Sequence, residues 1–106
     1  MNVSIKLKEE GGITQHSLFN AKALTLAHGE VRHVTLDGNA RQCDYRTTVE
    51  YEDGFHWEYT GFAWGYGGEG PNGLVTFMSE ATYSDRDSWR KLIFGLEPEL
   101  KDFPLL

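Results

Sequence analysis

The chain has 106 residues, of which 40% are hydrophobic and 25% charged, the composition of one folded domain spanning residues 1–106. Ten Lys and Arg residues against sixteen Asp and Glu residues give a net charge of −6, which disfavours a protein that coats DNA or RNA. The sequence has no apolar run near the roughly 20 residues that span a bilayer, and it has one cysteine, Cys43. We therefore expect a protein of a reducing, intracellular compartment that does not enter the membrane.

The first part of the chain predicts strands. Val3, Ile5 and Leu7 alternate with polar residues, the pattern of an antiparallel strand with one buried side. After two glycines, residues 13–19 are expected to return as a second strand, and residues 20–27 suit either a short helix or a strand. A further strand is expected over residues 31–36, followed by a polar loop over residues 40–45.

Residues 47–51 and 55–59 predict a hairpin whose loop length can be deduced. A two-residue turn would place the apolar side chains of the two strands on opposite faces. A three-residue loop, residues 52–54, pairs Tyr51 with Phe55 and Val49 with Trp57, so that the large apolar groups share one face. We therefore predict the three-residue loop, with Gly54 in a left-handed conformation at a bulge.

The last part of the chain predicts two helices. Pro71 suits the first turn of a helix, and apolar side chains follow at helical spacing: Leu74, Phe77, Met78 and Ala81. Ser84 and Asp87 have the spacing of a capping box, and a second apolar stripe follows: Trp89, Leu92, Ile93 and Leu96. Gly95 and Pro98 mark the end of that helix, and the apolar residues 101–106 are expected to dock on the body or on a partner.

Strands followed by helices indicate an α+β fold. We expect an N-terminal antiparallel sheet of about four to five strands, with two C-terminal helices packed on one face.

The most distinctive segment covers residues 61–74, where four glycines fall within residues 65–70. It resembles the hallmark of a family of small bacterial and phage domains of unknown function, in which aromatic-x-Trp-Gly-Tyr-Gly-Gly-Ser-Gly-Pro leads into a helix. Glu69 stands where the family has serine, and residues 72–73 replace its Ala-Gln pair. The resemblance implies a prokaryotic or phage source, hence the cytoplasm of a bacterial host, and a strand–loop–helix core; it implies no reaction. The matching residues are Phe62, Trp64, Gly65, Tyr66, Gly67, Gly68, Gly70, Pro71 and Leu74.

Two interpretations of this glycine loop stay open. In the first, glycine amides and the helix N-terminus bind a nucleotide or phosphate, with these candidate ligand residues: Trp64, Tyr66, Gly67, Gly68, Glu69, Gly70, Asn72 and Gly73. In the second, the glycines only let the backbone turn sharply beneath the aromatic side chains. Glu69 and the absence of Lys and Arg from residues 47–85 count against a phosphate, although Arg41, Arg46 or Arg86 could approach in three dimensions.

The sequence predicts no enzyme: we assign no catalytic residue, no metal ligand and no cofactor. The histidines His16, His28, His33 and His56 and the lone Cys43 lack the spacing of a zinc site, and no nucleophile motif is present.

Acidic and aromatic residues gather between residues 50 and 69, which predicts a surface that binds a host protein. Its candidate partner-binding residues are Glu50, Glu52, Glu58, Tyr59, Tyr66 and Glu69. We expect a non-enzymatic phage or mobile-element accessory protein that inhibits or regulates a host protein, such as a defence system. The alternative is a small-molecule binder that holds a nucleotide or phosphate at the glycine loop. A homodimer through the C-terminal helix or an edge strand also stays open.

Overall fold

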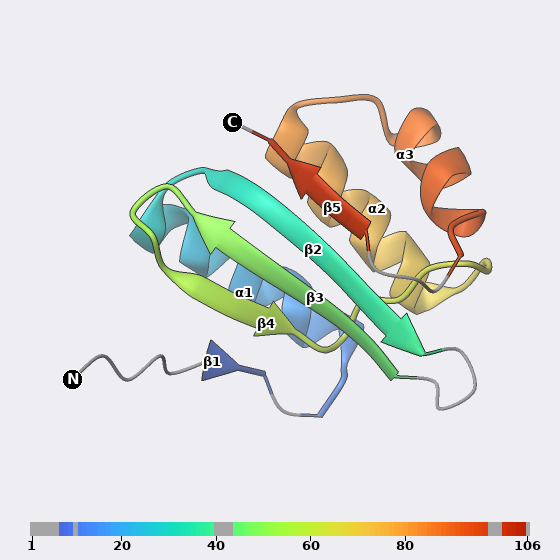
Figure 1. Cartoon of the computed structure of the whole chain (residues 1–106), viewed down its shortest axis with the longest axis horizontal. Helices are drawn as coiled ribbons and strands as arrows, with labels where there is room; N and C mark the ends of the chain where they lie inside the picture. The colour runs from blue at the N-terminus through green and yellow to red at the C-terminus, as the bar shows by residue number, and fades with distance from the viewer. Residues whose placement is uncertain (1–6, 10, 40–43, 98–100, 106) are drawn as a thin grey trace.

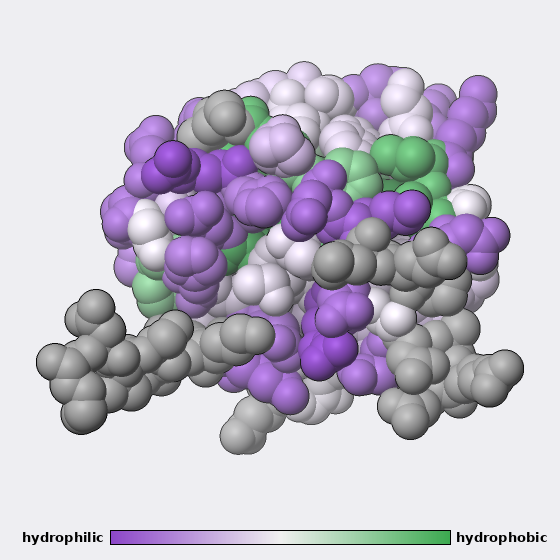
Figure 2. Space-filling view, in the orientation of Figure 1, coloured by the Kyte–Doolittle hydropathy of each residue, from purple (hydrophilic) through white to green (hydrophobic). Residues whose placement is uncertain are grey.

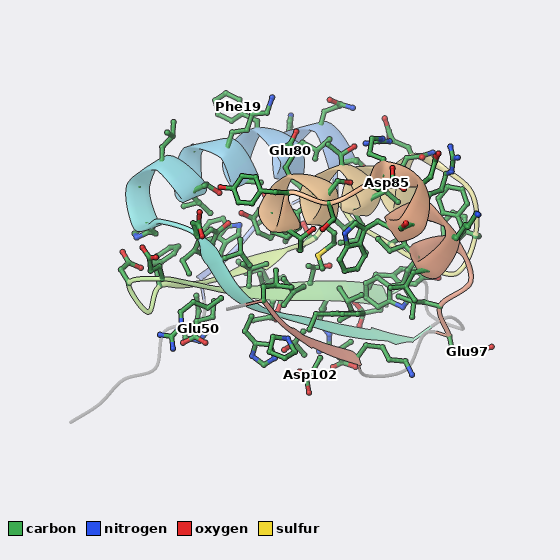
Figure 3. The ribbon with its side chains drawn as sticks, turned by 90° about the horizontal axis from the view of Figure 1, so that it is seen from above. Phe19, Glu50, Glu80, Asp85, Glu97 and Asp102 are labelled. Atoms are coloured by element: carbon green, nitrogen blue, oxygen red, sulfur yellow. The ribbon has the colours of Figure 1, made fainter. Side chains whose placement is uncertain are left out.

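A five-stranded sheet carries three helices on one of its faces in the described part of the chain (Figure 1 and Figure 3). The structure is a computed structural model, and it describes residues 7–9, 11–39, 44–97 and 101–105. The elements are β1 (Leu7–Lys8), α1 (Thr14–His28), β2 (Val31–Asn39), β3 (Asp44–Tyr51), β4 (His56–Tyr59), α2 (Glu69–Thr82), α3 (Arg86–Phe94) and β5 (Lys101–Pro104). The fold is α+β as predicted, with the two C-terminal helices α2 and α3 on the covered face.

Across the sheet the strands follow the order β1-β4-β3-β2-β5. The pairs β2–β3, β3–β4 and β2–β5 are antiparallel. β1 is parallel to β4, with Leu7 beside Trp57 and Lys8 beside Glu58, so the antiparallel orientation expected for this strand is wrong. Val3 and Ile5 of the expected first strand lie outside the described residues.

The second strand expected over residues 13–19 is wrong, because Ile13 is the residue before α1 and residues 14–19 belong to that helix. The positions of α1 that face the protein interior recur with helical spacing, but two of them, Thr14 and Ser17, are polar. An apolar periodicity therefore does not reveal this helix. Its interior side also carries Ala21, which is buried, and Leu24, which packs against the core.

The hairpin of β3 and β4 has the predicted register. Val49 pairs with Trp57, and the amide of Tyr51 donates to the carbonyl of Phe55 at 2.8 Å. Gly54 closes the three-residue loop with a φ of +91°, a left-handed conformation that glycine adopts without strain. Side chains on the covered face are buried as expected, with Val49, Tyr51 and Tyr59 at 0% exposure.

The two C-terminal helices form where they are predicted, but the apolar stripe of α3 is wrong in part, because Leu92 is exposed and Leu96 follows the last helical residue, Phe94. The cap of α3 also differs from the expected one. In α2, Pro71 lies in the first turn, and Leu74, Phe77 and Met78 of the predicted stripe are buried. The cap of α3 is Asp85, whose carboxylate accepts from the amide of Ser88 at 3.2 Å. The expected Ser84–Asp87 capping box is therefore wrong by one position.

The apolar tail docks on the body as β5, which pairs with β2. Its Phe103 packs edge-on against Trp89 of α3, with ring centroids 5.9 Å apart. The tail thus joins β2 to α3.

A buried polar cluster fastens α1 to the end of the sheet. The carboxylate of Glu9 accepts hydrogen bonds from the Ser17 hydroxyl, the Asn20 amide at 2.6 Å and the Thr60 backbone amide at 3.0 Å. The backbone of Gly61 donates to Ser17 Oγ at 2.9 Å. Segments that are far apart in sequence are therefore held together through one carboxylate.

Candidate functional site

A polar cavity of about 580 Å³ lies where β4 leaves the sheet toward α2. We call it the β4-end cavity. Its volume is in the range of small-molecule sites, roughly 300–1,000 Å³. The walls come from β1, β3, β4, the start of α1 and the segment that leads into the first turn of α2, and they include Lys8, Tyr45, Arg46, Glu58, Tyr66 and Gly70.

Glu58 is the more deeply buried of the two acidic residues that line this cavity. It lies on the face of the sheet that no helix covers, because its neighbour Tyr59 points into the core and side chains alternate along a strand. That face is mostly hydrophilic (Figure 2). The Glu58 side chain is nevertheless only 9% exposed, and its buried Oε2 atom has no hydrogen-bond partner among the residues that the structure describes. A buried carboxylate oxygen without a donor is costly, so Glu58 has an unused acceptor.

Two cations accompany Glu58 in the cavity wall. The ammonium of Lys8 lies 3.8 Å from Glu58 Oε2, and its side chain is 62% exposed. Arg46 donates to Asp37 at 2.8 Å and is 47% exposed. With Asp44 also in the wall, the charged side chains that line the cavity in the described part of the chain are balanced: Lys8 and Arg46 against Asp44 and Glu58. A neutral or singly charged ligand suits this balance better than a polyanion.

An aromatic wall closes one side of the cavity. The Tyr66 side chain is 48% exposed, and its ring centroid lies 6.4 Å from that of Tyr45. Tyr45 in turn meets Trp64 edge-on, with centroids 4.9 Å apart and the planes at 80°. The rings therefore run from the buried Trp64 to the exposed Tyr66, where a flat ligand can stack.

The glycine loop is packed mainly against the end of α3. The amide of Gly65 donates to the Ile93 carbonyl at 2.9 Å, and Gly65 has a φ of +87°. A Cβ atom on Gly67 would lie 3.5 Å from the ring of Phe94, and one on Gly65 would lie 2.8 Å from the Leu96 carbonyl. These contacts support the second interpretation of the loop, in which the glycines serve close packing.

Only part of the candidate ligand set reaches the cavity. Tyr66 and Gly70 line it. Trp64 and Gly73 are buried, and the Asn72 side chain donates to the Gly68 carbonyl at 3.0 Å. Glu69 is exposed at the first residue of α2. Of the three arginines considered, Arg46 lines the cavity. Arg86 donates a hydrogen bond to the Thr76 hydroxyl, and Arg41 lies outside the described residues.

The candidate partner-binding residues do not form one surface. Tyr59 is fully buried, since it faces the helices, so its expected place in an interface is wrong. Glu58 and Tyr66 share the β4-end cavity. Glu50 lies 3.8 Å from His56 near the opposite end of the hairpin, and Glu52 belongs to the turn there. Glu69 begins α2.

The most exposed apolar side chains lie instead on α1 and just after the end of α2. Phe19 is 72% exposed, Leu26 90% and Tyr83 81%. Beside them runs a groove of about 310 Å³ between α1 and α2, the α1–α2 groove, with these residues in its wall: Lys22, Leu26, Phe77, Glu80, Ala81 and Tyr83. Sequence reasoning missed this surface because it treated residues 13–19 as a strand. A helical projection of residues 19–27 would have found it.

Within the described residues, no group of three or more His, Cys, Asp and Glu side chains is placed to hold a metal ion. None of the helices described here has the length and apolarity needed to cross a membrane. Cys43 lies outside the described residues.

The chain was compared with protein-family models, with curated proteins and with solved structures, and nothing in these three groups matches it. The family resemblance of the glycine loop therefore stays a prediction.

Proposed function

We propose that the protein binds a small planar molecule in the β4-end cavity and that Glu58 accepts a hydrogen bond from an N–H group of that molecule. The observation that carries the proposal is Glu58, which lines the cavity and whose buried Oε2 atom has no hydrogen-bond donor among the described residues; a turn of the side chain would bring this atom to a ligand. A ligand amino group would supply the missing donor and offset the cost of burying the carboxylate.

The ligand class that fits best is a nucleobase, a nucleoside or a nucleoside monophosphate. The exposed ring of Tyr66 offers a stacking face for a flat heterocycle. A ring amino group is the donor that Glu58 lacks, while Lys8 and Arg46 can hold a ribose hydroxyl or a single phosphate. The charge balance of the wall and the net charge of −6 disfavour a triphosphate.

The test is isothermal titration calorimetry of the whole chain with a panel of nucleobases, nucleosides and nucleoside monophosphates. We expect Glu58→Ala and Tyr66→Ala each to raise the dissociation constant by about tenfold or more, because each variant loses a hydrogen bond or a stacking contact with the ligand. Glu50→Ala is the matched control, because Glu50 occupies the same face of the neighbouring strand outside the cavity wall.

Urea unfolding of each variant verifies that the fold is retained. No binding by the wild-type chain across the panel, or equal binding by Glu58→Ala, would refute the proposal.

The protein-inhibitor function predicted from the sequence is a second proposal. It is favoured by Tyr66 and Glu69, which are both exposed just before and at the start of α2. A bacterial host protein retained on the wild-type chain, purified and then bound directly, should lose affinity for Tyr66→Ala but not for Tyr83→Ala. Equal affinity for the two variants would contradict this second proposal.

A further inference from the structure

Helix α1 has apolar residues on two opposite sides. One side packs on the core and holds Ala21 and Leu24. The other side carries Phe19, Ala23 and Leu26, which are all exposed and recur at the spacing of one helical stripe. Figure 3 shows Phe19 pointing away from the sheet. We call these three residues the outer stripe of α1.

The outer stripe is part of a larger exposed apolar surface. Leu26 also forms part of the α1–α2 groove, whose wall continues through Ala81 to the exposed Tyr83. A continuous apolar patch on a folded chain marks an interaction surface, because burying it releases water at about 25 cal/mol per Å².

We propose that two copies of this chain associate through their outer stripes, with the two α1 helices antiparallel about a two-fold axis close to Ala23. The two large residues of the stripe, Phe19 and Leu26, lie on either side of that point. A two-fold axis between them therefore brings Phe19 of each copy against Leu26 of the other. The small side chain of Ala23 at the centre lets the two backbones come close.

Charge favours a second copy at this face over other faces of the protein. The chain carries a net charge of −6, so two copies repel each other across most of their surfaces. Helix α1 contains no Asp or Glu in its residues Thr14–His28. Two α1 helices can therefore approach without like-charge repulsion between carboxylates.

Opposite charges also lie side by side next to the outer stripe. Lys22 from α1 and Glu80 from α2 lie in the same wall of the α1–α2 groove and are both exposed. An antiparallel two-fold arrangement keeps both grooves on the same side of the helix pair, so charges of both signs gather along that side of the proposed interface.

Sedimentation velocity of the whole chain over a range of concentrations tests the proposal. We expect the mass to rise with concentration from the 12.0 kDa monomer toward a dimer. Leu26→Glu and Phe19→Glu should each weaken the dimer by more than about tenfold, because each buries a carboxylate against an apolar side chain of the other copy. Both side chains are exposed in the single chain, so the thermal midpoint should stay unchanged at concentrations where the wild type is a monomer. A monomer at every concentration would overturn the proposal.

Leu92→Glu is the matched control, since Leu92 is an exposed leucine of α3, 44% accessible. A dimer that is lost with Leu92→Glu and kept with Leu26→Glu would show that α3 forms the interface, which also overturns the proposal.

Cross-linking gives a readout that is independent of stability. In a Cys43→Ser background, Ala23→Cys should form a disulfide-linked dimer on mild oxidation. Gln15→Cys should not, because it lies about two helical turns from the axis, so that the two copies of residue 15 stay roughly 20 Å apart. Efficient cross-linking of Gln15→Cys without that of Ala23→Cys would rule out the antiparallel arrangement.

Discussion

The hydroxyl groups of Tyr51 and Tyr59 are hydrogen-bonded to each other inside the core, where both side chains are at 0% exposure. The two residues belong to neighbouring strands of the hairpin and both face the helices. Burial raises the pKa of Tyr51 to about 12 and also raises the pKa of Tyr59. Each tyrosine thus satisfies the polar atom of the other.

Removing one of these hydroxyl groups is expected to destabilise the protein. Tyr59→Phe leaves the Tyr51 hydroxyl without its buried partner and should lower the free energy of unfolding by about 1–2 kcal/mol. The double variant Tyr51→Phe/Tyr59→Phe should lose less than the sum of the two single variants, because no orphan remains. Urea unfolding measures all three, and strictly additive losses would argue against the coupling.

The same pair makes stability sensitive to alkaline pH. The pKa of Tyr51 rises from its ordinary value of 10.0 to about 12, so between these values the folded state holds a proton that the unfolded chain releases. The stability contribution is fully present below pH 10 and falls as the pH rises from there toward 12. Urea midpoints at increasing pH should fall more steeply for the wild type than for the double phenylalanine variant. Equal slopes would show that other groups cause the loss.

Glu9 is expected to contribute more to the free energy of unfolding than an exposed glutamate does. Glu9→Ala removes the acceptor of three donors, from Ser17, Asn20 and Thr60, and should cost about 2–3 kcal/mol. Glu97→Ala, at an exposed position, should cost less than about 0.5 kcal/mol. Chemical unfolding of the two variants side by side checks this, and similar losses would contradict a structural role for the cluster.

Alanine substitutions at two glycines are expected to destabilise the protein for different reasons, steric crowding at Gly61 and backbone strain at Gly54. A Cβ atom on Gly61 would lie 2.5 Å from the Ile13 carbonyl oxygen and from Ser17 Oγ, so Gly61→Ala should cost about 3 kcal/mol. Gly54 has no atom within 4 Å of such a Cβ but has a φ of +91°, so Gly54→Ala should cost about 1 kcal/mol. Thermal unfolding gives the order of the two, and the reverse order would mean that the α1 contact is loose.

The hairpin could be predicted because its information is local. Side chains alternate along β3 and β4, and only one loop length puts Val49, Tyr51 and Tyr59 on one face. Helix α1 could not be predicted in the same way. Its interior positions Thr14 and Ser17 are polar, and they are satisfied by Gly61 and Glu9, which come from other segments.

The candidate site was predicted in part for a related reason. Tyr66, Gly70 and Glu58 were candidates because of a glycine-rich segment and an acidic, aromatic hairpin, and these three line the β4-end cavity. Lys8 reaches the same cavity only through the parallel pairing of β1 with β4. No local sequence pattern indicates that pairing, so the position of Lys8 beside Glu58 could not be predicted.

The position of β5 has a consequence for synthesis of the protein. β5 covers the outer edge of β2, and Thr35 and Asp102, which are hydrogen-bonded across this pair, are 67 positions apart in the chain. A ribosome makes β2 long before it makes β5, so the edge of β2 stays open on every growing chain. Neighbouring chains on one messenger RNA therefore carry the same uncovered edge at the same time, until β5 is made and pairs with β2.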